Sequence, residues 1–390
     1  MAEFYNGDRG PNYPKPSEIV EQGVPFINAG DLINGHIDYH NCKHITSDKF
    51  NQLNGAKLKI NDIVYCLRGT IGKNGLVNSG ANATIASSLV CIRPVKLRPL
   101  FLFQILNSSI EERQRKMVDE GAAQPNISAT NLKKFLIPVP NDNEQEKIGE
   151  VFSKLNHLIT LQQRKLKQLK RLKTAMLQQL FVEKNSKLPI LRFKNFNGDW
   201  KQCKLGELVE SLFQGINTAA DKVEYSNNGL PIIQAKNITS GSLDFSGSRK
   251  LSVQKYSNYL DKYIPQKGDI LFANIGTIGP NVILKDTRQF FIAWNILRIV
   301  PQKNINGEFL KITLDLLNSK HYFEKLLTGN ATKFVNKNDM RNLPIFFSDP
   351  EEQNKISNLF KKLDFLITLQ QNKLTQLSTL KKYLLQKMFI

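Results

Sequence analysis

The side chains that could do chemistry in this chain of 390 residues form few of the patterns that catalysis or metal binding requires. His36, His40 and His44 are four residues apart, a spacing that on a helix would place three imidazoles on one face, suited to a metal ion. Gly35 and the polar residues around these histidines disfavour a helix, so we expect no metal site. There is no GxxxxGK[ST] loop, HExxH motif or Asn-Pro-Pro-Tyr-like tetrapeptide, so the sequence predicts no catalytic residues.

The tetrapeptide Gly-Thr-Ile-Gly occurs twice, from Gly69 and from Gly276. Each copy follows a run of residues typical of a β-strand, and neither carries the Lys and Ser of a phosphate-binding loop. A tight turn is therefore favoured over a phosphate cradle. Because both copies keep the turn, it could also present the polar residues beside it.

The composition indicates a folded, strongly basic protein. Hydrophobic residues make up 41% of the chain, and the formal net charge is +20 with a pI of about 9.6. A basic excess of this size favours a polyanionic partner, most simply nucleic acid, although an acidic protein partner is the alternative. No apolar run reaches the length of a membrane span, so we expect a cytoplasmic protein without a membrane partner. Its cysteines show no CxxC spacing and are expected to be free thiols: Cys42, Cys66, Cys91 and Cys203.

An internal repeat organises the chain. Residues 144–182 and 352–390 align without a gap at an offset of 208, with 22 of 39 positions identical. The segments between them repeat only in outline, for example around the two Gly-Thr-Ile-Gly turns. The chain therefore alternates variable and constant parts, and we expect four regions: domain one at 1–143, a central helix at 144–187, domain two at 188–351 and a C-terminal helix at 352–390.

The two constant segments have the composition of long helices, because they are rich in Leu, Lys and Gln and free of Pro. Their apolar residues recur every seven positions, which is the signature of a coiled coil. We expect helices at 146–182 and 354–390 that pair with each other, with Gln162 and Gln370 interrupting the stripe at equivalent places. These glutamines either set the register or lie at the rim. The predicted seam consists of Leu155, Ile159, Leu166, Leu169, Leu363, Ile367, Leu374 and Leu377.

The variable segments are typical of α/β domains, with short β-rich runs separated by Asn, Gly and Ser. In the first segment these runs are Pro25–Asn28, Asp62–Leu67, Ser88–Ile92 and Phe135–Val139. In the second they are Pro231–Gln234, Asp269–Ala273, Ile296–Val300 and Leu343–Phe347. Helical stretches are expected near Leu100–Met117 and Gly307–Leu327.

The charge is concentrated on the constant segments. Together, 144–187 and 352–390 hold +11 of the net +20, and seven basic residues with no acidic one lie between Lys154 and Lys173. A basic helix face is most simply solvated, but this one could bind DNA phosphates or an acidic protein surface. Our candidates for either contact are Lys167, Lys170 and Arg171.

This layout resembles the specificity subunit of type I restriction–modification systems over nearly the whole chain. The resemblance is carried by the two near-identical helices with their Glu-Gln-x-Lys-Ile starts, Glu144–Ile148 and Glu352–Ile356. It is also carried by the run Leu-Pro-x-Leu-Arg-Phe…Trp…Lys-Leu-Gly-Glu at Leu188–Glu207. One departure is that these 20 or so residues have no counterpart ahead of the first domain, since Met1 aligns near Glu207.

The resemblance implies an α/β fold in which two target recognition domains are separated by two long antiparallel coiled-coil helices in a pseudo-two-fold repeat. It implies a non-catalytic subunit that reads a bipartite, asymmetric site on double-stranded DNA. The partners it implies are two modification subunits, which carry S-adenosylmethionine and methylate adenine, and restriction subunits that translocate and cut. No cofactor is expected on this chain itself.

Residues that contact DNA are predicted from the two aligned halves, by keeping polar positions beside the shared turns and strand ends. Base edges are read by Arg, Lys, Asn and Gln, and phosphates by Ser, Thr and Lys. In the first domain the candidates are Asn28, Asp31, Arg68, Lys73, Asn74, Gln124 and Asn126. In the second they are Gln234, Lys236, Asn237, Asn274, Thr277, Lys333 and Asn336.

Two functions are alternatives to a DNA specificity subunit. A stand-alone scaffold of the same shape would bind double-stranded DNA without an enzyme partner, and co-purification of a modification subunit separates the two. A self-contained enzyme is disfavoured by the missing catalytic motifs.

Overall fold

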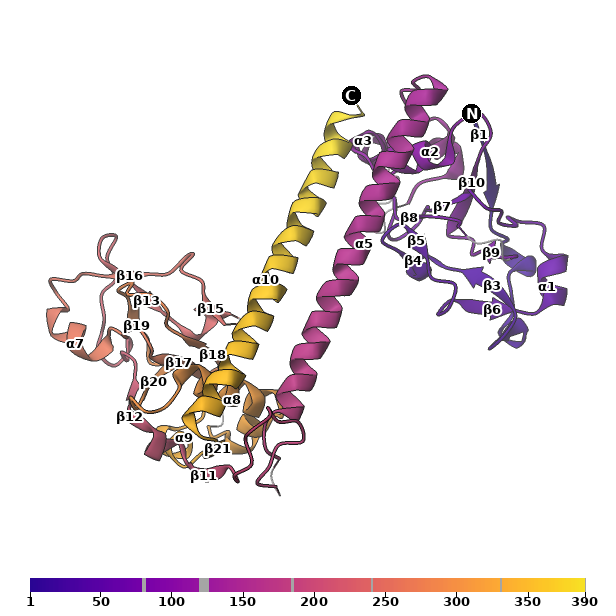
Figure 1. Cartoon of the computed structure of the whole chain (residues 1–390). Helices are drawn as coiled ribbons and strands as arrows, with labels where there is room; N and C mark the ends of the chain where they lie inside the picture. The colour runs from indigo at the N-terminus through magenta and orange to yellow at the C-terminus, as the bar shows by residue number, and fades with distance from the viewer. Residues whose placement is uncertain (79–81, 119–125, 184–185, 240, 330–331, 390) are drawn as a thin grey trace. The chain divides into compact units, whose positions relative to one another are not determined.

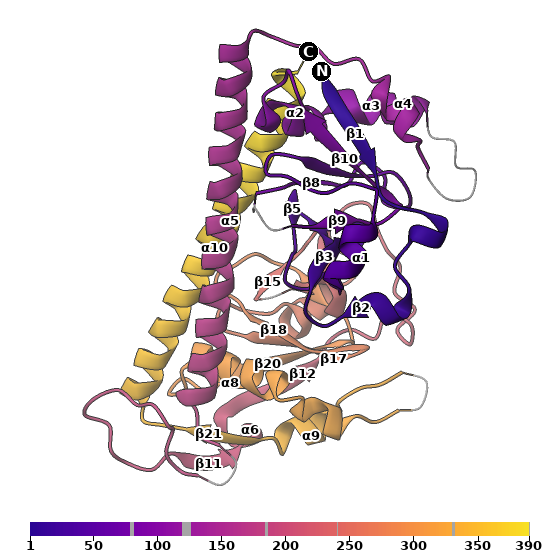
Figure 2. The ribbon, with the colours of Figure 1, turned by 90° about the vertical axis from the view of Figure 1, so that its right-hand side faces the viewer.

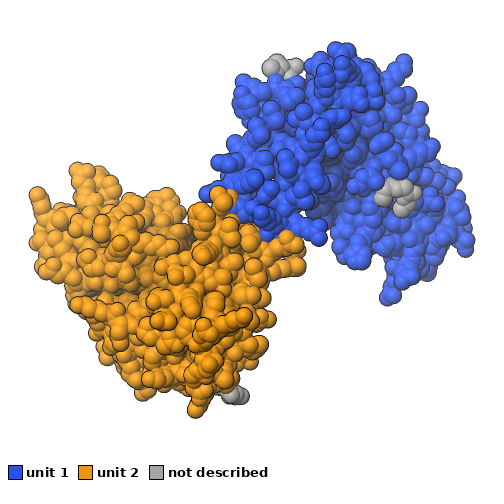
Figure 3. Space-filling model, viewed as in Figure 1, with its two compact units in different colours: residues 1–165, 370–390 blue, residues 166–369 orange. Residues whose placement is uncertain are grey.

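A computed structural model describes the chain except for residues 79–81, 119–125, 184–185, 240, 330–331 and 390. The described chain divides into two units, drawn in different colours in Figure 3. Unit 1 comprises residues 1–165 and 370–390, and unit 2 comprises residues 166–369. Two helices of 38 residues each contribute to both units: α5 (Asp142–Gln179) and α10 (Pro350–Lys387) (Figure 1).

Unit 1 is built on two four-stranded sheets. The first is antiparallel, with the order β1-β10-β7-β8, and the second has the order β2-β6-β3-β9 with β3 and β9 parallel. The first sheet comprises β1 (Ala2–Asn6), β10 (Leu89–Pro94), β7 (Ile63–Cys66) and β8 (Asn74–Leu76). The second comprises β2 (Ile19–Val20), β6 (Lys43–Ile45), β3 (Val24–Ile27) and β9 (Thr84–Ile85), and β4 (Leu32–Ile33) pairs with β5 (His36–Ile37).

The helices of unit 1 cover the first sheet. One core joins Tyr65 and Val90 of that sheet to Phe101 of α2, Phe152 of α5 and Phe389, which follows α10. In Figure 2, α2 lies between this sheet and the long helices. The short helices are α1 (Ser47–Gln52), α2 (Pro99–Ile105), α3 (Ser109–Met117) and α4 (Ala129–Lys133).

Unit 2 repeats this plan with longer strands. Its main sheet is antiparallel in the order β12-β20-β17-β18: β12 (Val209–Gln214), β20 (Ile296–Pro301), β17 (Ile270–Ile275) and β18 (Thr277–Ile283). Three smaller sheets accompany it. One has the strands β16 (Lys250–Leu251), β13 (Leu230–Ile233) and β19 (Phe291–Ile292). The other two are the pair β14 (Ile238–Thr239) and β15 (Ser242–Leu243) and the pair β11 (Lys201–Lys204) and β21 (Pro344–Phe347). The helices are α6 (Leu205–Leu208), α7 (Leu260–Tyr263), α8 (Gly307–Ser319) and α9 (Lys337–Arg341).

The expected α/β class is confirmed, with differences in single elements. The helix expected near Leu100–Met117 is two helices, because Ser108 caps a new one. Beyond α8, the stretch expected to be helical to Leu327 contains His321 at a φ of 54° and then a 3-10 helix. The strand expected at Phe135–Val139 is wrong, since no strand among the described residues pairs with it, whereas its counterpart in unit 2 is β21.

Both long helices begin four residues earlier than the repeat predicts. Asn141 Oδ1 accepts a hydrogen bond of 3.0 Å from the backbone N–H of Glu144, and Asp349 Oδ1 accepts one of 3.0 Å from that of Glu352. Asn and Asp are favoured as N-caps because their side chains satisfy free N–H groups of the first turn. The repeat alignment started too late to include these caps.

Within unit 1, the two helices pair antiparallel. Phe152 near the start of α5 stacks on Phe389 just after the end of α10, with ring centroids 6.0 Å apart. Further along α5, Gln162 accepts hydrogen bonds from the Nε2 of Gln370, one at its side chain and one of 3.3 Å at its backbone oxygen. Gln370 is buried, so this pair of equivalent residues lies inside the seam and not at its rim.

Within unit 2, the same helices pair in the same sense. Lys173 Nζ of α5 lies 2.6 Å from Asp364 Oδ1 of α10. Leu177 and Phe181 then pack with Ile356 and Phe360 in one buried cluster. All eight residues of the predicted seam are buried or half-buried.

Lys173 and Lys381 are equivalent in the repeat but differ in their surroundings. The counterpart of Asp364 in the first copy is Asn156, so Lys381 lacks the acidic partner that Lys173 has. Lys381 forms no ion pair with any residue that the structure describes, and desolvation lowers its pKa. A charged amine held in this seam is therefore expected to destabilise unit 1 at neutral pH.

We predict that Leu166→Asp combined with Leu374→Asp prevents folding, because each change puts an unpaired carboxylate in an apolar seam. The matched control is Leu172→Asp with Leu380→Asp, at equivalent positions on the same helices that are 43% and 46% exposed. Soluble yield and thermal melting by circular dichroism measure the effect. A seam variant as soluble and helical as the control would contradict this packing.

We also predict that Lys381→Met raises the midpoint of thermal unfolding at pH 7, by roughly 2–4 °C for each kcal/mol gained. The folded chain holds the pKa of Lys381 below its unfolded value, so wild-type stability rises with pH between those two values. The advantage of the variant should therefore shrink as the pH is raised towards 10. Lys382→Met, at an exposed position on the same helix, is the control and should change neither quantity.

Candidate nucleic-acid interface

The two Gly-Thr-Ile-Gly segments lie at the same place in both main sheets. In unit 1 the segment forms the turn between β7 and β8, whereas in unit 2 Gly276 makes the turn between β17 and β18 and Thr277–Gly279 begin β18. The glycines of both segments have positive φ: 77° at Gly69 and 85° at Gly72, and 76° at Gly276 and 105° at Gly279. Glycine adopts this conformation without strain, which explains why both copies keep it.

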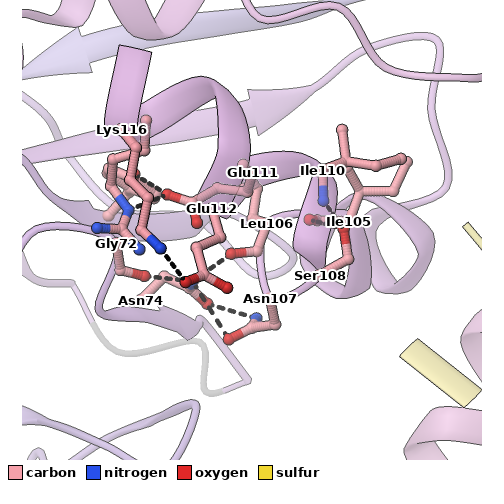
Figure 4. A network of polar contacts seen from close by, with 12 residues as sticks. Gly72, Asn74, Ile105, Leu106, Asn107, Ser108, Ile110, Glu111, Glu112 and Lys116 are labelled. Atoms are coloured by element: carbon pink, nitrogen blue, oxygen red, sulfur yellow. Dashed lines mark hydrogen bonds and ion pairs between the residues drawn. The ribbon is translucent and has the colours of Figure 1, made fainter. Parts of the chain in front are cut away.

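A buried asparagine anchors each turn to the helical layer. Asn74 donates from Nδ2 to the backbone oxygens of Gly72 at 2.8 Å and Leu106 at 3.1 Å, and its Oδ1 accepts from Asn107 at 2.8 Å (Figure 4). In unit 2, Asn281 donates to the oxygen of Gly279 at 3.2 Å and to Asp315 at 2.8 Å. These amides hold the turn in place and leave the side chains beside it free to vary.

Helix α3 adds a charged network behind the turn of unit 1. Buried Glu111 accepts hydrogen bonds from the Tyr65 hydroxyl at 2.5 Å and from Arg115 Nε at 2.8 Å. On the exposed side of the helix, Lys116 pairs with Glu112 at 2.7 Å (Figure 4). Burial beside the carboxylate raises the pKa of Tyr65. Because Tyr65 belongs to β7, the network fixes the strand that leads into the turn.

A returning segment lies against the end of the strand in each unit. The backbone N–H of Ile127 donates to Leu67 O at 2.9 Å, and in unit 2 that of Val335 donates to Asn274 O at 2.9 Å. This pairing brings Arg68 and Asn126 together in a β-bridge. Two predicted contact residues that are 58 positions apart in the sequence therefore lie side by side.

An open polar groove of about 690 Å³ lies at this place in unit 1. Arg68 and Asn126 line it with residues that follow β1, and Arg68 is exposed. Guanidinium and amide groups in an open groove can hydrogen-bond to base edges and phosphates. The polar side chains of the groove are those of Tyr5, Asn6, Asp8, Arg9, Asn54, Arg68, Asn126, Ser128 and Thr130.

The corresponding face of unit 2 is built from other residues. Gln214, the counterpart of Asn6, donates to Asn274 Oδ1 at 3.0 Å. Thr277 and Lys333 are exposed, and the backbone N–H of Gly276 donates to Lys333 O at 3.1 Å. Trp294, of which 41% is exposed, follows β19, and its backbone donates to Ile216 O at 2.7 Å. The two faces thus share a backbone and differ in side chains.

A second group of predicted residues lies around a short 3-10 helix in each unit. Asp31 Oδ2 accepts from the backbone N–H of Asn28 at 2.7 Å, and Lys73 Nζ donates to Ala29 O at 2.9 Å. In unit 2, Gln234, Lys236 and Asn237 line a small hollow of about 110 Å³ together with Arg249. Lys73 is half-buried and bound to a carbonyl, whereas Lys236 is exposed.

Three of the residues predicted to contact DNA are buried. Asn74, Asn237 and Asn274 are at most 5% exposed, and their amides are bound to neighbouring groups inside the fold. Asn336 is half-buried and caps α9. Gln124 lies outside the described residues. The predicted residues that present exposed side chains are Arg68, Lys236, Thr277 and Lys333.

The residues at the ends of β1 and β12 were not among those predicted from the sequence. Asn6 and Gln214 occupy equivalent places, followed by Gly7 and Gly215. A Cβ at Gly7 would come within 2.5 Å of Ala86 O, and one at Gly215 within 2.2 Å of Ala293 O, so only glycine fits. The matching Phe-Tyr-Asn-Gly and Leu-Phe-Gln-Gly runs, offset by 208, carried this signal.

The basic side chains predicted on the central helix face solvent. Lys167, Lys170 and Arg171 are all exposed on α5, within unit 2. Their geometry allows contact with a phosphate backbone or with an acidic protein surface.

The remaining chemical groups offer no further site among the described residues. No group of three or more His, Cys, Asp or Glu side chains there could hold a metal ion. All four cysteines are free thiols, and burial raises the pKa of Cys203 to about 11, which disfavours its reactive thiolate. No described helix is long and apolar enough to cross a membrane.

Comparisons with known proteins agree with this architecture. The chain is 22% identical to the type I restriction enzyme MjaVIII specificity subunit of Methanocaldococcus jannaschii, over 98% of this chain and 95% of that protein. It is 23% identical to the putative MjaX specificity subunit of the same organism, over 92% and 85%. The crystal structure of a type I restriction–modification S subunit from M. genitalium superposes with a TM-score of 0.64 at 17% identity, covering 100% of this chain and 94% of that one.

A family model matches the chain twice. The model of the type I restriction modification DNA specificity domain covers residues 2–171 and 197–379, so each half carries one copy. These matches contain the turns, the returning segments and most of both long helices. The chain therefore belongs to the type I restriction modification DNA specificity domain family.

Proposed function

We propose that this chain reads a split DNA site, with one half-site read by each unit, and that it directs the methylation of adenine and the cleavage of DNA by partner subunits. One observation carries the proposal. The two units keep the same buried anchors around the Gly-Thr-Ile-Gly turn while the side chains on the surrounding face differ. Two domains that share a backbone scaffold but differ in their surface side chains suit two different half-sites on one DNA duplex.

The groove of unit 1 carries the kinds of side chain that recognise a DNA sequence. Arg68 can donate two hydrogen bonds to a guanine edge, and Asn126 and Asn6 can pair with adenine. Arg9 and the other polar groups of the groove suit phosphate oxygens. The net charge of +20 supplies attraction that does not depend on sequence.

The chemistry is assigned to partners in this proposal. Two modification subunits would carry S-adenosylmethionine, and restriction subunits would translocate and cut, while this chain contributes binding and orientation. The relatives it resembles in M. jannaschii are specificity subunits of type I restriction enzymes. Such a complex acts on DNA in the cytoplasm. A stand-alone scaffold would bind the same DNA but would recover no modification subunit on purification.

We predict that Arg68→Ala relaxes one half of the recognition site, because a base-reading arginine contributes ~1–3 kcal/mol of discrimination. Lys333→Ala should act on the other half only. Each variant is expressed with the modification subunit in a host that lacks it, and methylated adenines are mapped across the genome. Arg113→Ala, an exposed arginine on α3, is the control and should leave the site unchanged.

If both variants methylated the wild-type site with wild-type affinity, these faces would not be the reading surfaces. If no methylation appeared with any variant or with the wild type, the role in directing modification would be wrong.

We further predict that changing Lys167, Lys170 and Arg171 to Gln weakens binding equally for cognate and random duplexes. Each phosphate contact contributes about −0.9 to the slope of log K against log salt, so the slope should flatten by roughly two to three units. The measurement is a salt titration of binding affinity with both duplexes. An unchanged slope together with lost co-purification of the modification subunit would assign these charges to the protein partner.

A further inference from the structure

The hollow of about 110 Å³ in unit 2 is bordered by two positive side chains, those of Lys236 and Arg249, and by no acidic one among the described residues. The Arg249 guanidinium lies over the Tyr225 ring, 4.4 Å from its centroid. Such stacking orients a guanidinium and leaves its N–H groups able to donate. Neither cation forms an ion pair with a residue that the structure describes. The volume is below the roughly 300–1,000 Å³ of pockets that hold whole small molecules, so the hollow suits a single anionic group.

Hydrogen bonds within unit 2 fix the two chain segments that line the hollow. Asn237, of which 5% is exposed, lies at the end of one segment. Its Oδ1 accepts from the backbone N–H of Gln234 at 2.9 Å, and its Nδ2 donates to Asp244 O at 2.8 Å. On the other segment, Ser248 Oγ donates to Phe245 O at 2.7 Å. The backbone that carries Lys236 and Arg249 is therefore already in place before any ligand binds.

The same backbone contact is made by an acid in unit 1. Asp31 Oδ2 accepts from the N–H of Asn28 at 2.7 Å, as Asn237 Oδ1 accepts from that of Gln234. Asp and Asn serve this role about equally well, so the contact does not require an amide. The amide in unit 2 keeps the hydrogen bond and removes a negative charge from beside the hollow.

The cations differ between the units as well. Gly30 stands in unit 1 where unit 2 has Lys236. The strand pairing makes Lys43 the counterpart of Arg249, because Pro25 pairs with His44 as Pro231 pairs with Lys250. Unit 1 thus has one cation and one acid at this place, whereas unit 2 has two cations and no acid. The shared fold does not account for that excess of positive charge, but an anionic ligand does.

The hollow is tied to the face that we propose reads bases. Asn295 Oδ1 accepts from the backbone N–H of Ala235 at 3.1 Å, and Asn295 O accepts from that of Asn274 at 3.3 Å. Ala235 directly precedes Lys236, and Asn274 comes two residues before Gly276 of the turn. One asparagine therefore links the hollow to the strand that enters the turn, which favours an anion of the DNA over a free one.

We propose that this hollow binds one phosphate group of the DNA backbone, beside the bases read by unit 2. The inference rests on the proposed function and deepens it. Lys236 and Arg249 donate to the phosphate oxygens, and the planar guanidinium can donate to two of them at once. A phosphate contact carries no sequence information but fixes the register of the protein on the duplex. Unit 1 lacks this pair of cations, so the two half-sites are held differently.

The test uses the full-length chain in complex with its modification subunit, and duplexes that carry the site found by mapping methylated adenines. In each duplex a different single phosphate is replaced by an uncharged methylphosphonate. We expect one position in the half-site of unit 2 at which replacement weakens binding to the wild type roughly tenfold, because a charged hydrogen-bond partner is lost. Lys236→Gln and Arg249→Gln should each weaken binding to the unmodified duplex and abolish the effect of that replacement.

The matched control is Lys250→Gln, at an exposed position next to Arg249 that does not line the hollow. This variant should keep the sensitivity to the same methylphosphonate. Salt titration gives a second readout. Because both cations serve one phosphate, combining Lys236→Gln with Arg249→Gln should flatten the slope of log K against log salt by about 0.9, the value for a single contact.

The outcomes separate this inference from the proposed function. If the wild type prefers the cognate duplex but no methylphosphonate affects it more than it affects the two variants, the inference is wrong and the proposed function stands. If the complex shows no preference for the cognate duplex, both are wrong.

Inorganic phosphate is the probe for a free ligand. It is added to the DNA-free chain at constant ionic strength, and thermal melting is followed. A rise in melting temperature that requires Lys236 and Arg249, with no methylphosphonate effect on the duplex, would assign the hollow to a free phosphorylated ligand and overturn its assignment to DNA.

Discussion

Everything else in this fold depends on the antiparallel packing of α5 against α10. A helix with a seven-residue apolar stripe must cover that stripe, and the second copy of the same sequence supplies the complementary surface. The seam is not uniformly apolar: buried Gln370 hydrogen-bonds Gln162 across it, and Lys173 meets Asp364. A polar pair of this kind is satisfied in one register only, since a slip of one turn would leave a buried amide without a partner. The pair therefore contributes to alignment more than to stability.

The helices also carry the sheets. Phe152 and Phe360 each join an aromatic cluster that includes a residue from the helical layer, Phe101 in unit 1 and Phe309 in unit 2. That layer in turn holds the Gly-Thr-Ile-Gly turn through Asn74 or Asn281. A continuous set of packed residues thus connects the seam to the Gly-Thr-Ile-Gly segment of each unit. Because every link is buried, the exposed side chains at the end can change without disturbing it.

The two units differ at the start of their long helix, because residues 188–204 pack only in unit 2. In unit 2, residues 188–204 bind Glu352 and extend β21. In the described part of unit 1, Glu144 is exposed and residues 136–139 pair with no strand. The seam differs between the units as well, because Lys173 pairs with Asp364 whereas Lys381 forms no ion pair with any described residue.

The sequence by itself determined the repeat, the two long helices, their seam and the α/β class, because these follow from periodicity and composition within short windows. It also located the turns, since glycine at positive φ leaves a mark in the sequence. Only the tertiary structure decided which polar residues face outward. Asn74, Asn237 and Asn274 have the right chemistry for reading bases, yet all three are buried. Asn74 and Asn274 bind backbone oxygens of distant segments, and Asn237 binds that of Asp244 nearby. Arg68 and Asn126 meet because a returning strand pairs with the end of another, and Asn6 and Arg9 join them through β1. Such neighbours are set by packing between residues far apart in the chain, which no local pattern records.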